Sequence, residues 1–530
     1  MAHSARSRLL SLPAAGLLAL GLLSGPSSAA DAADASPASG SPAADSARTR
    51  AEHALDAARD LLGGSADTAA RRTRSPHSGD DASTVLRELA LTASALPAAQ
   101  RSQARALLAR PSTNQVYCSA SLCVHWSTSF LGGSSIDTTD ADGDGVPDYV
   151  ETVASTVAKV QRLYRAAGYR AVLSDQGAGG NDLPDLYLED LGSQGLYGYC
   201  TTDESVPANG PYDVWAYCSL DNDYATSQFP TNTPLENLRV TVAHEYFHAV
   251  QYAYDVAEDP WLLEATATWA EDEVFDGVDD NRQYLPAGPL GDPRSSMDLF
   301  EGARPYGDWL FIRYLTERFP RRSGPLPVLV RHIFQLADGS RGAPDLYSLQ
   351  AIDKVLRRDH GIDLARAFAD FSAANTHPAS VYSEGEAYRP APLWTRGSLG
   401  PSRRSSGWQS TSLDHLTSAT IRFDPASGLR ASSWRLRLDL DLPDTARGSA
   451  AVVTTRTANG RFRDVPVRLD RSGDARVRVP FSVRDVRYVT VTLVNGSRRL
   501  DCDQNTDYAC QGDPRDDALP ARIRGTVSRG

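Results

Sequence analysis

The sequence lacks an excess of positive charge, and it lacks a long apolar run beyond its first thirty residues. Its formal net charge is -12, with 54 lysine and arginine residues against 66 aspartate and glutamate residues. A protein that binds nucleic acid generally carries a basic footprint, so this balance argues against a nucleic-acid partner. No later stretch reaches about twenty uncharged apolar residues, the length needed to cross a bilayer. We therefore expect a soluble mature protein without a membrane anchor.

Cysteine is scarce, and its spacing excludes a zinc-finger arrangement. The six cysteines fall as three near pairs: Cys118 with Cys123, Cys200 with Cys218, and Cys502 with Cys510. In an oxidising compartment an even number of cysteines is typical of disulfides, although spacing alone leaves the connectivity open. A thiolate of Cys118 or Cys123 that blocks a metal site is the alternative.

The first thirty residues have the composition of a secretory signal. Arg6 and Arg8 supply positive charge, an apolar core runs from Leu9 to Leu23, and residues 28–30 are Ser-Ala-Ala. This core is interrupted by Pro13 and is too short to span a membrane. We expect cleavage near residue 30, export and an extracellular location.

Residues 31–115 are rich in alanine, serine, aspartate and arginine and poor in aromatic residues. Helical patterns appear around Ala51–Leu62 and Thr84–Leu108. Its position directly after an export signal leads us to interpret this segment as a helical propeptide. A disordered linker is the alternative.

The most informative stretch is His244-Glu245-Tyr246-Phe247-His248. On a helix, two histidines four residues apart lie on one face and can offer two nitrogens to one zinc ion. A catalytic zinc takes about three protein ligands and leaves one position for water, so a third ligand is needed. Asp259 as N-cap and Pro260 predict a second helix from Trp261, with Glu264 in its first turn. Glu264 is therefore the candidate third ligand.

Glu245 follows the first histidine and is placed to take a proton from water as a general base. The expected reaction is hydrolysis of a peptide bond without an acyl-enzyme intermediate. Glu271 lies seven residues after Glu264 and either orients a ligand histidine from the second shell of the metal or is a helix-surface carboxylate. The alternative for His244 and His248 is that they are core histidines on an amphipathic helix.

These motifs resemble those of the gluzincin zinc metallopeptidases. The segment Trp261–Glu271, WLLEATATWAE, resembles the WLNEGxAxxxE stretch of zinc aminopeptidases and of secreted bacterial neutral metalloproteases. HEYFHAVQ together with WLLEATATWAED is also similar to a poorly characterised group of secreted bacterial metalloproteases. The resemblance implies a two-lobed zincin-like domain with a metal-binding cleft, the ligands His244, His248 and Glu264, and Glu245 as base.

Two differences from known motifs limit which zinc peptidases the sequence resembles. A metzincin would place its third histidine at Tyr254, and the only methionine beyond Met1 is Met297, so a metzincin is not expected. No GxMEN-like sequence is present to hold the amino terminus of a substrate, which favours an endopeptidase over an aminopeptidase.

Gluzincins often use a tyrosine or histidine to stabilise the oxyanion, and Tyr306 is our candidate for this catalytic role. It opens a YGxxLF pattern that is found downstream of the zinc site in related secreted enzymes. Packing at a helix start is the alternative role. Tyr252, Tyr254 and His332 are weaker candidates.

The run from Asp140 to Glu151 matches a twelve-residue calcium loop. Its expected ligands are Asp140, Asp142, Asp144, the Val146 carbonyl, Asp148 and Glu151. Gly145 falls at the sharp turn of the loop. Because glycines and serines precede it instead of a helix, the loop resembles those of extracellular modules. A solvated acidic turn is the alternative, and the acidic run at residues 271–280 is a weaker candidate for another cation.

The chain is expected to have an α+β fold, with a catalytic domain at residues 116–400 and a β-sandwich at 407–530. Strands are predicted at Val124–Ser127, Leu186–Glu189 and Val214–Ser219, and the zinc helix at Leu235–Tyr254. Further helices are predicted at Tyr306–Arg318, Leu326–Leu336, Leu346–Arg357 and Leu364–Ala374. We hypothesise that the Leu186–Glu189 strand pairs with an extended substrate at a sheet edge.

The leading hypothesis is a secreted, monomeric zinc endopeptidase with a structural calcium ion and a protein or peptide substrate. One rival is a catalytically idle adhesin in which the metals are structural. The presence of Glu245 argues against it, because a structural zinc needs no base. An exopeptidase that acts on cell-wall peptides is the other alternative.

Overall fold

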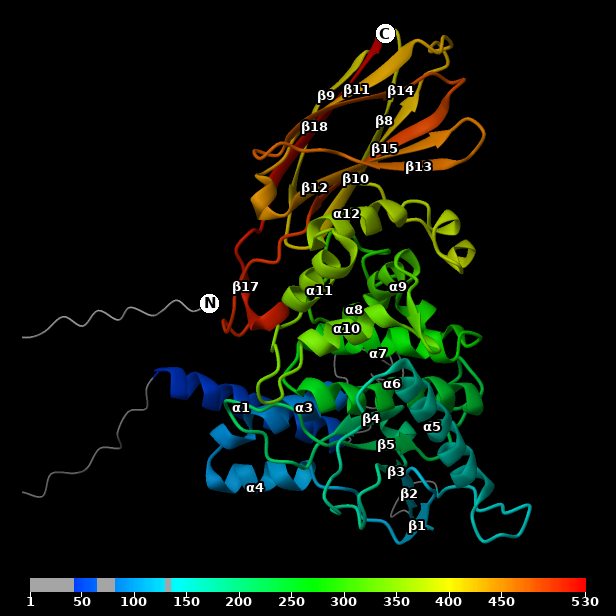
Figure 1. Ribbon diagram of the computed structural model, residues 1–530, viewed down its shortest axis with the longest axis vertical. Coiled ribbons are helices and arrows are strands. Elements are labelled where there is room, and N and C mark those ends of the chain that lie inside the picture. Colours follow the sequence, from blue (N-terminus) through cyan, green and yellow to red (C-terminus); the bar gives the residue numbers. More distant parts are fainter. Residues whose placement is uncertain (1–41, 64–81, 129–134) are drawn as a thin grey trace, which may run out of the picture. The chain divides into compact units, whose positions relative to one another are not determined.

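The computed structural model describes residues 42–63, 82–128 and 135–530 (Figure 1). The expected signal at residues 1–30 lies outside the described residues, as does part of the expected propeptide. Helices and several separate sheets make up the described chain, so the coarse prediction of a mixed α+β fold is confirmed. None of the described helices is long and apolar enough to cross a membrane.

The first sheet has five strands in the order β1-β2-β3-β5-β4. Their bounds are β1 Gln115–Cys118, β2 Cys123–Trp126, β3 Asp185–Glu189, β4 Gly198–Thr201 and β5 Tyr217–Asp221. β3 pairs in parallel with both β2 and β5, while β4 pairs antiparallel with β5 and forms an edge. The hypothesis that the β3 segment adds a substrate strand is therefore wrong, because the backbone of β3 is already paired on both sides.

Three long helices accompany this sheet: α5 Asp148–Ala167, α6 Pro234–Asp255 and α7 Pro260–Val274. α6 begins with a capping box, in which the Thr233 hydroxyl accepts from the Glu236 backbone N–H and the Glu236 carboxylate accepts from the Thr233 N–H. This exchange satisfies two donors of the first turn. α6 packs against β4, β5, α5 and α7, which explains why it is buried on nearly every side.

The next part of the chain is mostly helical. Its helices are α8 Arg304–Gly307, α9 Trp309–Arg318, α10 Val328–Leu336, α11 Leu349–Val355 and α12 Leu364–Ala374, with a short β6–β7 hairpin at Arg322–Ser323 and Leu326–Pro327. The helix predicted at Tyr306–Arg318 is divided in two. Gly307 lies so close to the backbone of Gly288 that an added Cβ would come within 2.5 Å of the Gly288 nitrogen. This close approach requires glycine where α8 ends.

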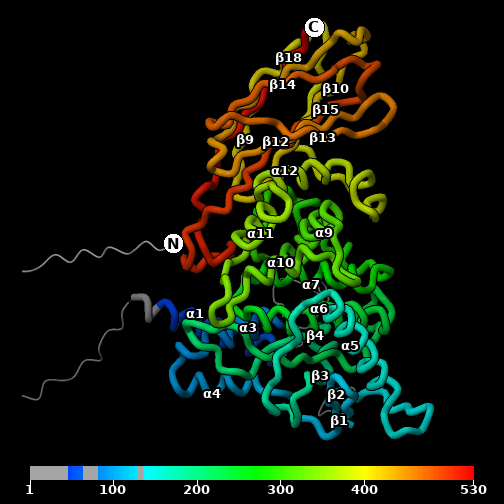
Figure 2. Tube along the Cα trace, in the orientation of Figure 1, coloured from blue at the N-terminus to red at the C-terminus, as the bar shows by residue number. Residues whose placement is uncertain are grey.

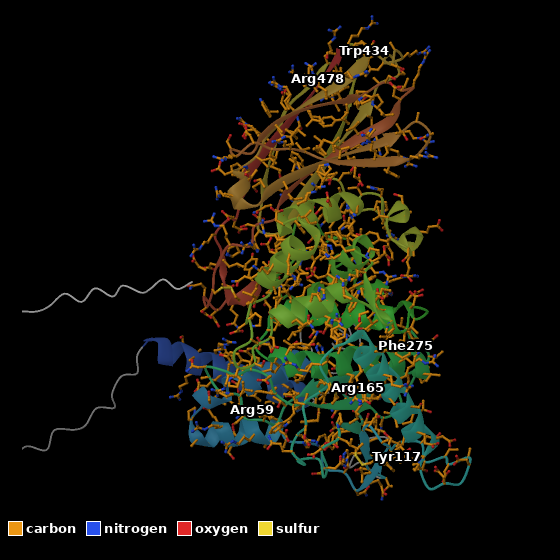
Figure 3. All side chains as sticks on the ribbon, viewed as in Figure 1. Arg59, Tyr117, Arg165, Phe275, Trp434 and Arg478 are labelled. Atoms are coloured by element: carbon orange, nitrogen blue, oxygen red, sulfur yellow. A yellow bond between two sulfur atoms is a disulfide. The ribbon has the colours of Figure 1, made fainter. Side chains whose placement is uncertain are left out.

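Two further sheets share one apolar core near the C-terminus. Their orders are β13-β12-β15-β10-β8 and β14-β11-β18-β9. The strands are β8 Thr395–Leu399, β9 Ser405–Leu413, β10 Thr417–Pro425, β11 Trp434–Asp441, β12 Ser449–Thr457, β13 Phe462–Pro466, β14 Asp474–Pro480, β15 Val486–Asn495 and β18 Leu519–Arg529. In β11 the leucines at 436, 438 and 440 are buried, as expected for a sheet with one covered face. Trp434 and Arg478, labelled in Figure 3, come from the paired strands β11 and β14.

The first of these strands, β8, begins at Thr395, ahead of the expected start at residue 407. It pairs in parallel with β10. A two-stranded sheet, β16 Leu500–Asp501 with β17 Asp513–Pro514, lies in the connection before β18.

The described part of the N-terminal segment is helical: α1 Pro42–Leu62, α3 Ala82–Thr92 and α4 Ala98–Leu107. α3 packs against the edge strand β4, and Figures 1 and 2 show it beside the sheet. Leu86 and Leu89 of α3 are fully buried in the same core as α6 and α7. This segment is thus packed against the rest of the chain, and the linker alternative does not describe α3.

All six cysteines form disulfides: Cys118–Cys123, Cys200–Cys218 and Cys502–Cys510. The prediction of three near pairs is confirmed. The alternative of a metal-blocking thiolate is wrong, because Cys118 and Cys123 are bonded to each other.

Candidate metal centre

The two histidines of α6 and Glu264 of α7 meet in the core. Burial leaves His244 7 %, His248 1 % and Glu264 1 % exposed. One donor atom from each residue lies within 4.8 Å of the other two. The Asp259 carboxylate does not cap α7; it accepts from the Trp261 indole and from the Cys510 backbone N–H instead. Glu264 nevertheless occupies the second turn of α7 and faces both imidazoles.

The spacing of these donor atoms is close enough for one metal ion to bind all three residues. The two Glu264 carboxylate oxygens lie 3.2 Å from His244 Nε2 and 3.5 Å from His248 Nε2. Two donors that are each about 2.0 to 2.1 Å from a tetrahedral zinc ion are separated by about 3.3 Å. Among the described residues, His248 Nε2 is buried and makes no hydrogen bond that meets the usual geometry; its recorded polar contact is the Glu264 oxygen at 3.5 Å. An orphaned ring nitrogen at this point is the expected state of a metal ligand.

The other nitrogen of each histidine is held by a side chain. Glu271 Oε1 lies 2.6 Å from His244 Nδ1, and Gln251 Oε1 lies 2.7 Å from His248 Nδ1. Gln251 is fixed in turn by donating to the Thr266 hydroxyl at 2.9 Å. These contacts place a hydrogen on Nδ1, so Nε2 is the nitrogen that would bind a metal ion after losing its own proton. Glu271 is 6 % exposed, so the surface alternative for this residue is wrong.

Gln251 was not among the residues singled out from the sequence. Its position three residues after His248 on the same helix, HAVQ, is the signal that could have identified it.

The buried carboxylates and imidazoles change one another's proton affinity. Burial lowers the pKa of His244, but hydrogen bonds to Glu264 and Glu271 outweigh it and raise that pKa well above its ordinary value. Burial raises the pKa of Glu264, yet the charge of His248 and the hydrogen bond from His244 lower it overall. For Glu271 burial dominates and raises the pKa to about 7. Cations are therefore stabilised between these carboxylates, and a divalent ion would displace protons from the imidazoles.

The carboxylate of Glu245 is occupied by the N-terminal segment. The Ser83 hydroxyl of α3 donates to Glu245 Oε2 at 2.8 Å and accepts from the Cys200 backbone N–H at 2.8 Å. Ser83 is 1 % exposed and Glu245 is 4 % exposed. The base predicted from the sequence is thus covered by a residue 162 positions earlier in the chain.

Two more residues of α3 contact the site or its margin. The Thr84 hydroxyl donates to Glu264 Oε1 at 2.9 Å. The Arg87 guanidinium, which is 4 % exposed, donates to the backbone carbonyls of Val256 and Glu258 just after α6. No local sequence signal marks these residues, because each contact joins segments far apart in the chain.

Tyr306 lies at the margin of the site. Its ring centroid is 6.0 Å from that of His244 and 5.1 Å from that of Tyr284, and its side chain is 2 % exposed. Tyr252 lies near His248, with ring centroids 6.3 Å apart. By contrast, the Tyr254 hydroxyl accepts from the Arg170 N–H, and His332 pairs with Asp359, so neither belongs to the site.

The predicted calcium loop folds as a series of tight turns. Asp140, Asp142 and Asp144 bring carboxylate oxygens within 4.8 Å of one another. The Asp140 carboxylate accepts from the N–H groups of Gly143 and Gly145, and the hydrogen bond from Gly145 leads the causes that lower its pKa. Gly145 has a φ of 93°, which favours glycine at the sharp turn.

The two remaining carboxylates of the loop are on the first turn of α5. The Asp148 carboxylate accepts from the Ala141 N–H at 3.0 Å. Desolvation and repulsion from the loop aspartates raise the pKa of Glu151. Both side chains thus face the same loop, although only three of its carboxylates meet closely.

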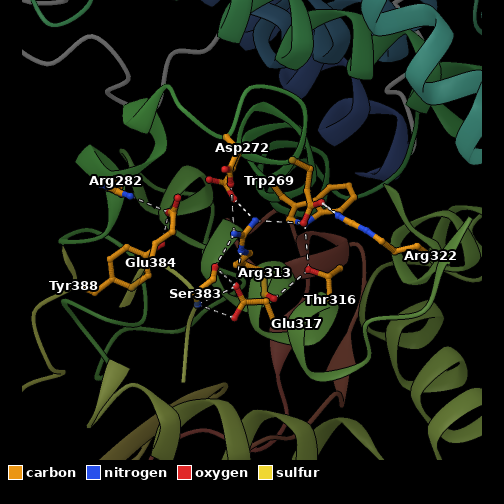
Figure 4. A network of polar contacts seen from close by, with 12 residues as sticks. Trp269, Asp272, Arg282, Arg313, Thr316, Glu317, Arg322, Ser383, Glu384 and Tyr388 are labelled. Atoms are coloured by element: carbon orange, nitrogen blue, oxygen red, sulfur yellow. Dashed lines mark hydrogen bonds and ion pairs between the residues drawn. The ribbon is translucent and has the colours of Figure 1, made fainter. Parts of the chain in front are cut away.

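A third acidic group, at Asp272, Asp276 and Glu384, also brings carboxylates within 4.8 Å. Figure 4 shows Arg313 beside Asp272 and Arg282 beside Glu384. Arg313 pairs with Asp272 at 2.5 Å, and Arg282 pairs with Glu384 at 3.1 Å. Because these cations already neutralise the carboxylates, the group needs no metal ion.

No family model and no curated protein matches this chain.

Proposed function

We propose that this chain is a secreted zinc-dependent endopeptidase that hydrolyses peptide bonds with water, using Glu245 as general base. The observation that carries the proposal is the buried group of two imidazoles and one carboxylate, with donor atoms within 4.8 Å of one another, next to a further carboxylate. His244, His248 and Glu264 would hold the zinc ion. A structural zinc site would not require Glu245 beside it.

The residues of the site suit this chemistry. A bound zinc ion would polarise the substrate carbonyl and lower the pKa of water. Glu245 takes the proton from that water and delivers it to the leaving amine. Glu271 and Gln251 keep both imidazoles in the tautomer that presents Nε2. Tyr306 is proposed to donate a hydrogen bond to the oxyanion from beside His244.

The remaining features are consistent with an exported enzyme. Three disulfides are typical of extracellular proteins. The Asp140–Glu151 loop is proposed to bind calcium and to stabilise the start of α5. A zincin-like catalytic domain related to gluzincins, a propeptide before it and a C-terminal β-sandwich domain belong to the same proposal.

Replacing Glu245 by glutamine tests the reaction. With the N-terminal segment removed by limited proteolysis, the Glu245→Gln variant is expected to bind zinc normally and to cleave casein roughly 10²- to 10⁴-fold more slowly. The control is Glu386→Gln, which removes one exposed carboxylate in the helical part of the chain and is expected to change nothing. Equal cleavage by both zinc-loaded variants would refute the mechanism.

A further inference from the structure

The Ser83 hydroxyl of α3 makes the hydrogen bond that a reacting water would make. Its oxygen lies 2.8 Å from Glu245 Oε2 and donates to it. A nucleophilic water must donate to the same carboxylate at the same kind of distance before it loses its proton. A hydroxyl and a water molecule compete for one acceptor position, so Ser83 takes the place of water at Glu245 Oε2.

The same hydroxyl also accepts a hydrogen bond from a backbone N–H of the edge strand β4. It accepts from the Cys200 N–H, which points away from β5 and is the kind of group that pairs with an added extended chain. α3 packs along β4, so its helical backbone stands where an extended substrate would lie. A substrate and α3 therefore cannot occupy this edge together.

Two further contacts hold α3 in place. Thr84 donates to Glu264, the proposed third ligand. Arg87 lies on the same face of the helix as Ser83 and donates to two carbonyls just beyond the C-terminal end of α6. The Val256 carbonyl belongs to the residue that caps the C-terminal end of α6, where the helix dipole is negative and favours a guanidinium. Asp255 and Asp259 are also close enough to Arg87 for its charge to lower their pKa, although burial raises both to about 7.

We propose that α3 is a built-in inhibitor that closes the active site through Ser83 and Thr84 and is anchored there by Arg87. The inference rests on the proposed zinc peptidase function and specifies how that site is regulated. The intact chain is latent, and activity requires that α3 leave β4 and α6. Arg110, which follows α4, is paired with Asp175, Asp185 and Asp203, so the chain beyond it stays anchored when α3 departs.

The test uses the intact, zinc-loaded chain and three substitutions in α3. Ser83→Ala removes the hydroxyl on Glu245, Thr84→Val removes the hydroxyl on Glu264 while keeping its shape, and Arg87→Met removes the anchor while keeping an apolar stem. A hydrogen bond to a charged group contributes about 1.5 to 3 kcal/mol, so each change is expected to raise the open fraction by roughly 10- to 100-fold. Ser94→Ala, an exposed hydroxyl just beyond α3, is the control.

Two readouts separate the inference from the proposed function. The first is the affinity for a dipeptide hydroxamate, a zinc-chelating probe, measured by calorimetry. The second is the rate of peptide cleavage. Both are expected to rise roughly 10- to 100-fold in the α3 variants and to stay unchanged in the control. Thermal unfolding checks that each variant is folded. If Ser83→Ala does not fold, Thr84→Val tests the same inference.

Each outcome has one meaning. Tighter hydroxamate binding without peptide cleavage by any form would support α3 as the inhibitor and refute the peptidase function. Equal hydroxamate affinity in the wild type and in all folded variants would overturn the inference, even if the enzyme cleaves peptides. A chain that takes up no zinc would overturn both.

Discussion

The two proposed metal sites of this protein are built in opposite ways. The His244, His248 and Glu264 centre is at most 7 % exposed and joins two helices, whereas Asp142 and Asp144 of the acidic loop are exposed. The loop is shaped by hydrogen bonds between residues two to seven positions apart. The buried centre is shaped by packing and by carboxylates 20 and 27 positions from His244.

This difference predicts that substitutions at the two sites will have effects of different size. A buried donor that loses its partner cannot turn to water, so changes in the helical centre should be severe. An exposed carboxylate in the loop can be replaced by solvent, so changes there should be mild. The following substitutions test this contrast, in order of expected effect.

Glu264→Ala should have the largest effect on metal binding. It removes one of the three donors and leaves Glu271, on the far nitrogen of His244, as the nearest carboxylate held against the two imidazoles. The affinity for zinc should fall by more than the roughly 10- to 100-fold expected for loss of an outer partner. Competition with a fluorescent chelator measures it. Unchanged affinity would remove Glu264 from the ligand set.

Glu271→Gln should have an intermediate effect on the affinity for zinc. The amide keeps an acceptor for the His244 Nδ1–H but loses the negative charge that supports the imidazole. Zinc affinity should fall by roughly 10- to 100-fold while the folded structure is kept. The same chelator competition serves here, with Glu386→Gln as matched control. A loss equal to that of Glu264→Ala would mean that Glu271 binds the metal directly.

Calcium should stabilise the chain without changing the zinc centre. Loops of extracellular modules bind calcium with dissociation constants of about 10⁻⁴ to 10⁻³ M, so 10 mM calcium should add roughly 1.4 to 2.7 kcal/mol to stability. Thermal unfolding with and without calcium measures this, and Asp142→Asn should reduce the gain. If calcium has no effect on unfolding, the run is a solvated turn.

Asp276→Asn should have almost no effect on metal content. Its carboxylate lies 3.9 Å from Arg313 and is exposed, and such pairs contribute little. Elemental analysis after dialysis against zinc and calcium should give the wild-type stoichiometry. Loss of one bound ion would show that the third acidic group is a metal site after all.

The sequence predicts the parts of this protein that depend on short spacing. Two histidines one helical turn apart, a carboxylate beside them and the twelve-residue loop all follow from local geometry. The start of α7 at Pro260 and the three near cysteine pairs also follow from residues that are close in the sequence.

Contacts between residues that are far apart in the sequence were not predictable. The strand order places β5 between β3 and β4, so the edge of the sheet is β4 and not the apolar segment at β3. The division of the predicted helix at Tyr306 depends on Gly307 meeting Gly288, a contact invisible in the periodicity of either segment. The Ser83 hydroxyl reaches Glu245 only because α3 folds across β4.

The Cys200–Cys218 disulfide joins residues that face each other in β4 and β5. An edge strand that loses its outer neighbour usually frays, because nothing but backbone hydrogen bonds ties it to the sheet. Here a covalent crosslink at the residue whose N–H meets Ser83 keeps that strand aligned. If α3 departs, as proposed, β4 should therefore stay ordered and able to pair with an extended substrate.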